Sequence, residues 1–372
     1  MNHRIAMVTT AHPHDDVRIY HKQAKTLARA GWRVEIINSH FAGTDENGIR
    51  FCRVALPGGR IWRMLSARKA ARQALLESRA DICVLHDPEL LVLLSYLQRM
   101  AMRTVYDAHE DLPAQLLTKP WIPTPLSGTA ARLGRRLLTQ YLPLADGVMA
   151  ATDKIALTLT GLNDRVCVVQ NRPTQEDCAL FDMARNNITQ VHNAVCYAGA
   201  LTEQRGLYRM ISCCYAAGAT LLLAGVFENE AVQKRAEAMP EYACVQYCGI
   251  LERQGIAELY AKCCAGLVLL DDTPSYRNSE PIKLFEYLCA GLPVIASDFL
   301  HWRDMTLASG VTFVSNSQDD DAVSAVRQAI THPVEVDIKA ARQKFSFKAD
   351  EDRLLQFFDA LEQKGRRQPS TF

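Results

Sequence analysis

The chain has 372 residues, of which 48% are hydrophobic and 22% are charged, and its formal net charge is +1. These values describe a globular protein with a full core and enough length for two domains of ordinary size. The sequence also argues against a membrane-spanning protein, because no uninterrupted apolar run approaches the roughly 20 residues of a transmembrane helix. The first residues lack the apolar segment of a signal peptide, so we expect a cytoplasmic location.

Charge is distributed unevenly along the chain. Residues 1–170 carry 22 Lys and Arg against 15 Asp and Glu, a balance of +7, whereas residues 171–372 carry 20 against 26, a balance of −6. A basic half suggests an anionic substrate or an anionic membrane face as a partner. An uneven surface charge without function explains the counts equally well. We expect no nucleic acid among the partners.

The twelve cysteines are scattered through predicted strands and helices, and no Cys-x-x-Cys motif occurs. The adjacent pairs Cys213-Cys214 and Cys263-Cys264 lie in helical patterns. Free thiols that fill small apolar spaces in a reducing compartment explain this distribution better than disulfides do.

The first half of the chain alternates apolar runs with amphipathic segments. It opens with an apolar run at 4–10, a helix from about Val17 to Ala30 and a strand at Arg33–Asn38, a βαβ order that implies a parallel sheet. Further strands are predicted near 49–55 and at Ile82–Leu85, Thr104–Tyr106, Gly147–Ala150 and Val166–Val169, with helices near 61–78, 89–101, 125–143 and 152–161. No Gly-x-Gly-x-x-Gly follows the first strand, which argues against a dinucleotide-binding dehydrogenase.

The polar stretch after Gln170, through about Asn193, has weak periodicity, and we interpret it as the crossing between two domains. A second series of strands is predicted at Ala194–Tyr197, Thr220–Ala224, 243–247, Gly266–Leu270, 292–296 and Gly310–Val314. The helices of this series are predicted at 207–217, 228–238, 253–263 and 319–331. The last helix, Ala349–Gln363, has apolar Leu354, Leu355, Phe358 and Leu361 on one side, and we expect it to pack on the first domain.

We therefore predict an α/β protein with two Rossmann-like, doubly wound parallel-sheet domains that face a cleft. The first comprises residues 1–170 with the last helix, at about 349–365, and the second comprises residues 174–345. In such sheets ligands bind beyond the carboxyl ends of the strands, so residues that directly follow strands are the informative ones.

The stretch PSYRNSEPIKLFEYLCAGLPVIASD at 274–298 carries the densest signal. Ser279 or Glu280 could cap a helix on which Lys283 and Glu286 share one face, at i and i+3. A cation and a carboxylate beside a helix N-terminus could hold a phosphate and a sugar hydroxyl. Taken alone, such a pair is more often a solvated helix face with a weak ion pair.

This stretch resembles the donor-binding region of the family 4 glycosyltransferases, which have the GT-B fold. In that family a Glu-x7-Glu motif precedes A-x-G-x-P-V-I-A, and AGLPVIASD follows Glu286 here. Glu286 matches the second glutamate of the motif, which the resemblance implies to hold the nucleotide ribose. Asn278 stands where the family has the first glutamate, which usually contacts the donor sugar ring.

The resemblance covers nearly the whole chain. YAGALTEQRG at 197–206 is similar to the family's G-R-L-x-x-x-K-G, with Ala200 in place of the arginine and Arg205 in place of the lysine. Arg205 and Lys283 would then stabilise the leaving diphosphate. The implied donor-binding residues are Gly199, Arg205, Asn278, Ser279, Glu280, Lys283, Leu284 and Glu286. The N-terminal HPHDDVRIYHKQAKTLARAGWRV is similar to a branch of the family that works on bacterial surface polysaccharides.

On the acceptor side, His86 and His109 each follow a predicted strand, and Glu110 lies beside the second. A histidine with nearby carboxylates could position or deprotonate an acceptor hydroxyl, and His109 best matches the family's active-site histidine. Histidines that satisfy turn backbone groups remain the alternative, above all for His86. Asp16 and Arg18 lie in the first strand–helix loop and would shape the acceptor side or pair with each other.

Asp271-Asp272 and Asp319-Asp320-Asp321 lack the Asp-x-Asp spacing of a metal-bridged sugar nucleotide, so we expect neither a metal ion nor another cofactor. A basic segment could form a membrane-surface helix or an ordinary surface helix. It contains Arg60, Trp62, Arg63, Met64, Leu65, Arg68, Lys69 and Arg72, and Arg132, Arg135 and Arg136 add a second basic group.

The resemblance thus implies a retaining, metal-independent hexosyltransferase that uses a UDP- or GDP-linked sugar. Its acceptor would be a glycan or polyprenyl-diphosphate-linked hydroxyl in O-antigen, capsule or exopolysaccharide synthesis, with the basic surface on the inner face of the cell membrane. Two alternatives remain. One is a nucleotide-sugar epimerase of the same fold, and the other is a non-catalytic binding or scaffold protein, which Ala200 and Asn278 suggest.

Overall fold

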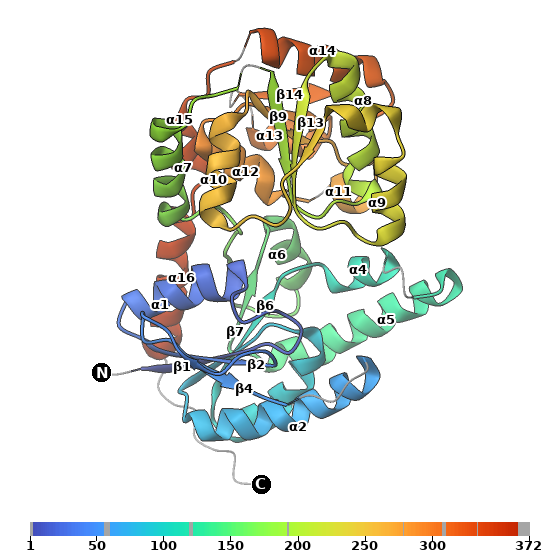
Figure 1. The fold of residues 1–372 in the computed structure, drawn as a ribbon. Coiled ribbons are helices and arrows are strands. Elements are labelled where there is room, and N and C mark those ends of the chain that lie inside the picture. Colours follow the sequence, from blue (N-terminus) through green and yellow to red (C-terminus); the bar gives the residue numbers. More distant parts are fainter. Residues whose placement is uncertain are drawn as a thin grey trace. The chain divides into compact units, whose positions relative to one another are not determined.

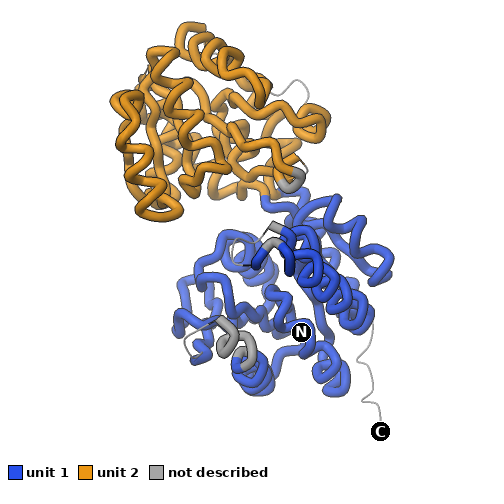
Figure 2. Tube along the Cα trace, turned by 90° about the vertical axis from the view of Figure 1, so that its right-hand side faces the viewer, with its two compact units in different colours: residues 1–171, 348–372 blue, residues 172–347 orange. Residues whose placement is uncertain are grey.

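The computed structural model of the chain describes residues 3–55, 60–118, 122–191, 193–277, 279–306, 310–332 and 334–363. Contacts between residues divide the chain into two compact units (Figure 2). The first unit is Met1–Asn171 together with Lys348–Phe372, and the second is Arg172–Phe347. The C-terminal helix therefore belongs to the first unit.

The sheet of the first unit is almost wholly parallel (Figure 1). Its strands are β1 (Arg4–Val8), β2 (Arg33–Asn38), β3 (Gly43–Thr44), β4 (Arg50–Arg53), β5 (Ile82–Leu85), β6 (Arg103–Ala108), β7 (Gly147–Ala150) and β8 (Val166–Val168). They lie in the order β3-β4-β2-β1-β5-β6-β7-β8, and among these strands the β3–β4 pair alone is antiparallel. Because β1 pairs with both β2 and β5, the strand order reverses there, which is where sheets of this kind bind ligands.

The first unit also contains ten helical segments among its described residues. They are η1 (Val17–Ala24), which is π-helical, α1 (Lys25–Arg29), α2 (Arg60–Ser78), η2 (Pro88–Leu93), α3 (Leu94–Arg99), α4 (Leu112–Thr118), α5 (Thr124–Tyr141), η3 (Leu142–Leu144), α6 (Asp153–Leu159) and α16 (Lys348–Gln363). The Asp16 carboxylate caps η1, accepting hydrogen bonds from the backbone N–H groups of Arg18 at 2.8 Å and Ile19 at 2.9 Å.

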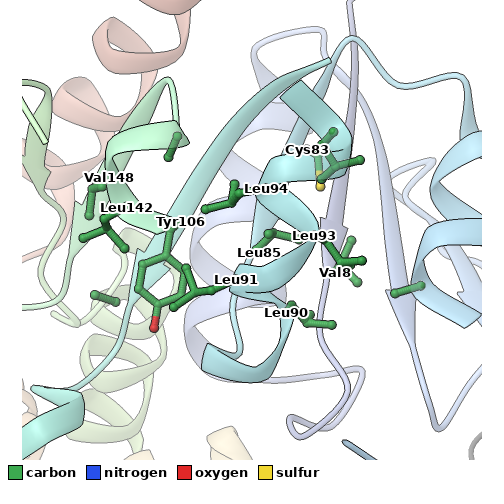
Figure 3. Packing of buried hydrophobic residues seen from close by; sticks show 14 of the residues in the cluster. Val8, Cys83, Leu85, Leu90, Leu91, Leu93, Leu94, Tyr106, Leu142 and Val148 are labelled. Carbon is green, nitrogen blue, oxygen red and sulfur yellow. The ribbon is translucent and has the colours of Figure 1, made fainter. Parts of the chain in front are cut away.

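A leucine-rich core covers one face of this sheet (Figure 3). It joins Leu90, Leu91, Leu93 and Leu94 of η2 and α3 to Val8, Leu85 and Tyr106 of the strands. Fully burying one such aliphatic side chain contributes about 1.5–3 kcal/mol. The cluster therefore holds η2 against the sheet and fixes the turn before it, which contains His86 and Asp87.

The C-terminal helix α16 packs its apolar side on the first unit, as predicted. The buried side chains include Leu354, Phe358 and Leu361. Phe357 is buried as well, whereas Leu355 is only half-buried. The ring of Phe357 lies against Gly147 of β7, where an added Cβ would come within 2.7 Å of it. A larger residue at this position would therefore force the ring of Phe357 to shift.

The second unit has a parallel sheet of its own. Its strands are β9 (Ala194–Ala198), β10 (Thr220–Ala224), β11 (Val245–Tyr247), β12 (Ala265–Val268), β13 (Val294–Ser297) and β14 (Val311–Val314), in the order β11-β10-β9-β12-β13-β14. Its helices are α7 (Gln175–Asn187), η4 (Glu203–Arg205), α8 (Leu207–Ala217), α9 (Glu230–Glu237), η5 (Pro240–Cys244), α10 (Arg253–Lys262), α11 (Pro274–Arg277), α12 (Ile282–Ala290), α13 (Leu300–Thr306), α14 (Asp319–Thr331) and α15 (Ile338–Phe345). Separate apolar clusters join α7, α10 and α12 to one face and α8 and α14 to the other (Figure 1). Two α/β units with parallel sheets confirm the predicted fold class.

Two local predictions in this unit were wrong. The polar stretch interpreted as a crossing forms helix α7, because Thr174 and Asp177 make a reciprocal capping box whose spacing outweighs the weak periodicity. Neither Ser279 nor Glu280 caps α12, which begins after Pro281 without a side-chain cap. The Ser279 hydroxyl instead donates to the carbonyl of Tyr276 at 3.0 Å.

Candidate active site

In the first unit, the buried carboxylate of Asp107 contacts several polar residues near the carboxyl ends of β1, β5 and β6. Asp107 of β6 accepts hydrogen bonds from Arg18, through Nε at 2.9 Å and Nη2 at 2.6 Å, and from Gln23 at 2.7 Å. Its Oδ2 also lies 3.2 Å from Nδ1 of His86 and 3.1 Å from Nε2 of His109. The two imidazoles are therefore held by one carboxylate, with 3.3 Å between their facing nitrogens.

Arg18 keeps this carboxylate ionised. Burial alone would raise the pKa of Asp107, but the nearby guanidinium of Arg18 and the imidazole of His109 hold it well below its usual range. Burial lowers the pKa of His86, whose imidazole is wholly covered. The ionised Asp107 favours a proton on Nε2 of His109, which leaves Nδ1 to accept a hydrogen bond from a ligand.

His12 extends the cluster toward solvent. Its ring lies 4.6 Å from that of His109, and its nitrogens lie 3.4 Å from Asp16 and 3.6 Å from Asp87. The hydrogen bond to Asp16 raises the pKa of His12 against the opposing effect of burial, and Asp87 raises it further. Asp87 itself is fixed by the hydroxyls of Thr9 and Thr10, each at 3.1 Å. Neither His12 nor Asp107 was singled out from the sequence.

The predicted acceptor-side residues thus take different positions. His109 is partly exposed, with 18% of its side chain accessible, and Glu110 is exposed. His86 and Arg18 are buried, so neither faces an acceptor directly, because both are bound to Asp107. Asp16 and Arg18 do not form the side-chain pair that the sequence allowed, since Asp16 caps η1 and contacts His12.

The cluster also has the spacing of a metal site, since ligand atoms of His86, Asp107 and His109 lie within 4.8 Å of one another. Arg18 already neutralises the Asp107 carboxylate by a two-point contact. A divalent ion bound there would be repelled by the guanidinium. These residues therefore fit an internal ion cluster better than a metal centre.

In the second unit, Glu286 of α12 is the centre of a second buried network. Its Oε2 accepts hydrogen bonds from Tyr260 at 2.8 Å and from Lys283 at 2.6 Å, and its Oε1 accepts one from Arg253 at 3.2 Å. Arg253 in turn donates to Asp177 at 3.0 Å. The predicted pair of Lys283 and Glu286 is present, but Glu286 is only 2% exposed rather than on a solvated helix face.

The network keeps Glu286 charged. Burial would raise the pKa of this carboxyl, but Lys283 and Arg253 lower it to about 2. A buried glutamate that stays ionised at neutral pH can accept hydrogen bonds from ligand hydroxyls, which a protonated one does less well. Sequence reasoning missed Arg253 and Tyr260. The signal for either was weak, because each lies in an ordinary helix.

Arg205 lies in the loop after β9. It ends η4, where its backbone N–H donates to Thr202, and its guanidinium interacts with the hydroxyls of Tyr197 and Tyr276. Gly206 follows with φ +75°, and an added Cβ would come within 1.9 Å of the carbonyl oxygen of Leu269. Glycine at this position thus holds the Arg205 loop close to the end of β12.

The other predicted donor-side residues differ in exposure. Leu284 is fully buried, so only its backbone could contact a ligand. Glu280 is largely covered and lies 4.0 Å from His301. Gly199 follows β9, where an added Cβ would lie 3.0 Å from the hydroxyl of Tyr197. Asn278 lies outside the described residues, as do the side chains of 60–65 in the basic segment.

Comparison with known proteins identifies the first unit. Residues 17–172 match the family described as "Glycosyl transferase 4-like domain". The first unit therefore contains a glycosyl transferase 4-like domain. No curated protein matches its sequence.

Solved structures resemble this chain over both units. Sucrose-phosphate synthase from Thermosynechococcus elongatus is 14% identical with a TM-score of 0.68, and covers 97% of this chain and 96% of its own. HepE of Anabaena, in complex with UDP, is 13% identical with a TM-score of 0.69, covering 96% and 100%. WaaG, involved in lipopolysaccharide biosynthesis, is 16% identical with a TM-score of 0.63, covering 95% of each chain. At these identities the likeness shows the fold, which is GT-B as predicted.

Proposed function

We propose that this chain is a glycosyltransferase, which moves a sugar from a nucleoside diphosphate to a hydroxyl of a glycan or lipid-linked acceptor in surface polysaccharide synthesis. The observation that carries the donor half of the proposal is the ionised Glu286 beside Lys283 in the first turns of α12. An anionic leaving group is stabilised by cations and by a helix N-terminus, and Lys283 and Arg205 supply the cations. HepE binds UDP, which supports a nucleotide ligand for the same fold.

The proposal assigns the acceptor to the histidine cluster of the first unit. His109 is the partly exposed imidazole there, and the ionised Asp107 orients it. Its Nδ1 would accept a hydrogen bond from the acceptor hydroxyl as the new glycosidic bond forms. Asp107 and Arg18 act on this step only by holding the imidazole.

The proposed reaction proceeds without a metal and with retention of the anomeric configuration. The family 4 resemblance implies both features, and the charge on the leaving diphosphate would be balanced by Arg205 and Lys283. Dialysis against a chelator should therefore leave the transfer rate unchanged, and addition of Mg²⁺ should not raise it.

The basic surface of α5 is proposed to bind an anionic membrane, where a lipid-linked acceptor would reside. Arg132, Arg135 and Arg136 are exposed on this helix and line a concavity of about 610 Å³ with Thr139 and Gln140. No Asp or Glu occurs between Asp111 and Asp146, and Leu126 and Leu133 are exposed on the same helix. None of the helices in the described part of the chain has the length and apolar composition needed to cross a bilayer.

The experiment that tests the proposal is a screen of UDP-, GDP- and ADP-sugars by thermal shift, followed by transfer assays with the sugars that bind. A ligand at one hundred times its dissociation constant adds about 2.7 kcal/mol to the free energy of unfolding. NMR of the product then reports the anomeric configuration. Isomerisation of the sugar without acceptor would identify an epimerase, and binding without transfer to any acceptor would identify a scaffold protein.

A further inference from the structure

Two aromatic rings stack at the surface of the first unit, beyond the carboxyl end of β2. The ring of Phe41 lies on the imidazole of His14, with 4.8 Å between the ring centroids and 30° between the planes. Phe51 of β4 is buried and lies edge-on to both, at 5.4 Å from Phe41 and 5.9 Å from His14. Phe41 itself is 42% exposed, and in the part of the first unit that the structure describes no other Phe, Tyr or Trp is exposed.

A buried polar residue fixes the backbone of this exposed ring. Asn38, the last residue of β2, is fully buried. Its Oδ1 accepts hydrogen bonds from the backbone N–H groups of His40 at 2.8 Å and Phe41 at 2.7 Å, and its Nδ2 donates to the carbonyl of Phe41 at 3.0 Å. The ring is therefore held in place before any ligand arrives, so a ligand that packs on it costs little further ordering.

The aromatic pair lies on the same edge of the sheet as the histidine cluster. His12 and His14 belong to one loop after β1, and the ring of His12 lies 4.6 Å from that of His109. The strands β2, β1, β5 and β6 are successive neighbours, and three spacings of about 4.8 Å separate β2 from β6 by about 14 Å. This separation exceeds the width of one sugar ring, so a sugar on Phe41 is not the sugar that reacts at His109.

Polar groups surround the aromatic pair. The side chain of Asp15 is 62% exposed, and His40, next to Phe41, is exposed as well. A pyranose has C–H groups on its face and hydroxyls around its rim. The C–H groups pack on the negative face of an aromatic ring, and the hydroxyls form hydrogen bonds with carboxylates and imidazoles. The surface therefore fits a sugar better than a lipid chain, which has no groups for the polar rim.

We propose that Phe41 and His14 form a subsite for a sugar of the acceptor glycan, remote from the hydroxyl that reacts. The acceptor then carries at least two sugars, and the aromatic pair selects acceptors by their length. The inference rests on the proposed function, because that proposal assigns the neighbouring histidine cluster to the acceptor.

The test measures binding of the full chain to an array of mono-, di- and longer saccharides from bacterial surface polysaccharides, followed by calorimetry with those that bind. Wild type should bind saccharides of two or more sugars more tightly than the single sugars they contain. Phe41→Ala should weaken this binding about tenfold or more, because it removes the apolar area and the aromatic face. Phe41→Trp keeps an aromatic face and should retain binding, whereas Phe41→Leu should resemble Phe41→Ala.

The matched control is Tyr215→Ala, which removes an aromatic ring that is 53% exposed on α8 of the second unit and should bind like wild type. Circular dichroism checks folding, and if Phe41→Ala does not fold, His14→Ala removes the other ring and should show the same loss. Wild-type affinity in folded Phe41→Ala, or an equal loss in Tyr215→Ala, would overturn the inference.

Titration with UDP and GDP separates this inference from the proposed function. Phe41→Ala should bind either nucleotide as wild type does, because Phe41 lies in the other unit from the proposed donor site. Wild type that binds a nucleotide but no saccharide of the array would overturn the inference and leave the donor half of the proposed function intact. Wild type that binds neither nucleotide would overturn the proposed function, and the inference with it.

Discussion

Arg18 and Asp107 form a two-point ion pair inside the first unit, with Nε to Oδ2 at 2.9 Å and Nη2 to Oδ1 at 2.6 Å. The Arg18 residue is 4% exposed and Asp107 is fully buried. Because Asp107 also holds His86 and His109, this pair sets the position and the charge of both imidazoles.

Removing the cation of this pair should destabilise the first unit. Arg18→Met leaves a buried carboxylate without its main counter-charge, which typically costs about 3–5 kcal/mol of unfolding free energy. Urea denaturation followed by circular dichroism measures the loss. Arg50→Met is the matched control, because Arg50 is largely exposed and 3.4 Å from Glu35, and it should cost about 0–1 kcal/mol. Equal losses in the two variants would contradict the account.

The pKa of His12 should depend on Asp16. The hydrogen bond to Asp16 is the largest cause that raises the pKa of His12 above 6.5, so Asp16→Asn should lower it. Histidine NMR shifts across a pH titration measure the change directly. A His12 pKa that stays unchanged in Asp16→Asn would contradict the contact.

The same contact has a predictable effect on stability. A raised pKa means that the folded protein binds the proton more tightly than the unfolded chain. The stabilisation is therefore fully present below about pH 6.5 and is lost as pH rises through the folded pKa. Asp16→Asn should lower the unfolding free energy more at pH 5.5 than at pH 8.5, because its amide oxygen can still accept the capping hydrogen bonds of η1 while the charge beside His12 is lost.

Lys283 should set the acid limit of nucleotide binding. The pKa of Glu286 is lowered from 4.5 to about 2 in the folded protein. The folded carboxylate therefore keeps its charge below pH 4.5 and loses it only as the pH falls toward 2. Lys283→Met removes the main counter-charge and should raise the pKa of Glu286, so nucleotide affinity should begin to fall at a higher pH than in wild type. Lys234→Met, in an exposed pair with Glu230, is the control. Identical pH profiles in all three proteins would count against the role of Lys283.

The basic face of α5 should determine membrane binding. Replacing Arg132, Arg135 and Arg136 by Gln should abolish sedimentation with vesicles that contain anionic lipid, since each cation near such a surface contributes about 1 kcal/mol. Binding of wild type should also weaken between low and high salt. The control replaces three exposed cations of the second unit, Lys234, Arg235 and Arg327, by Gln. Equal loss in both triple variants, or salt-insensitive binding, would contradict a specific role for α5.

The sequence predicted those features of the fold and the site that depend on residues close together in the chain. The order of strands and helices, and the pairing of Lys283 with Glu286, follow from periodicity and spacing along one segment. Asp107 and Arg253 could not be found this way, because their partners lie far along the chain, 89 residues away for Arg18 and 76 for Asp177. Burial also changed the interpretation of Arg18 and His86, which a loop position had suggested to be open to a ligand. The capping box of α7 was a local signal that was overlooked.

The central claim is that the ionised Glu286 binds the nucleotide of a sugar donor. Glu286→Gln keeps the shape of the side chain but replaces one acceptor oxygen by an NH2 donor and removes the charge that Lys283 and Arg253 face, so folding is tested first by circular dichroism. Calorimetric titration with the nucleotide sugar that stabilises wild type is the most direct measurement. We predict that Glu286→Gln binds it at least about tenfold more weakly, as expected for loss of a charged acceptor. Folded Glu286→Gln with wild-type affinity would contradict the claim.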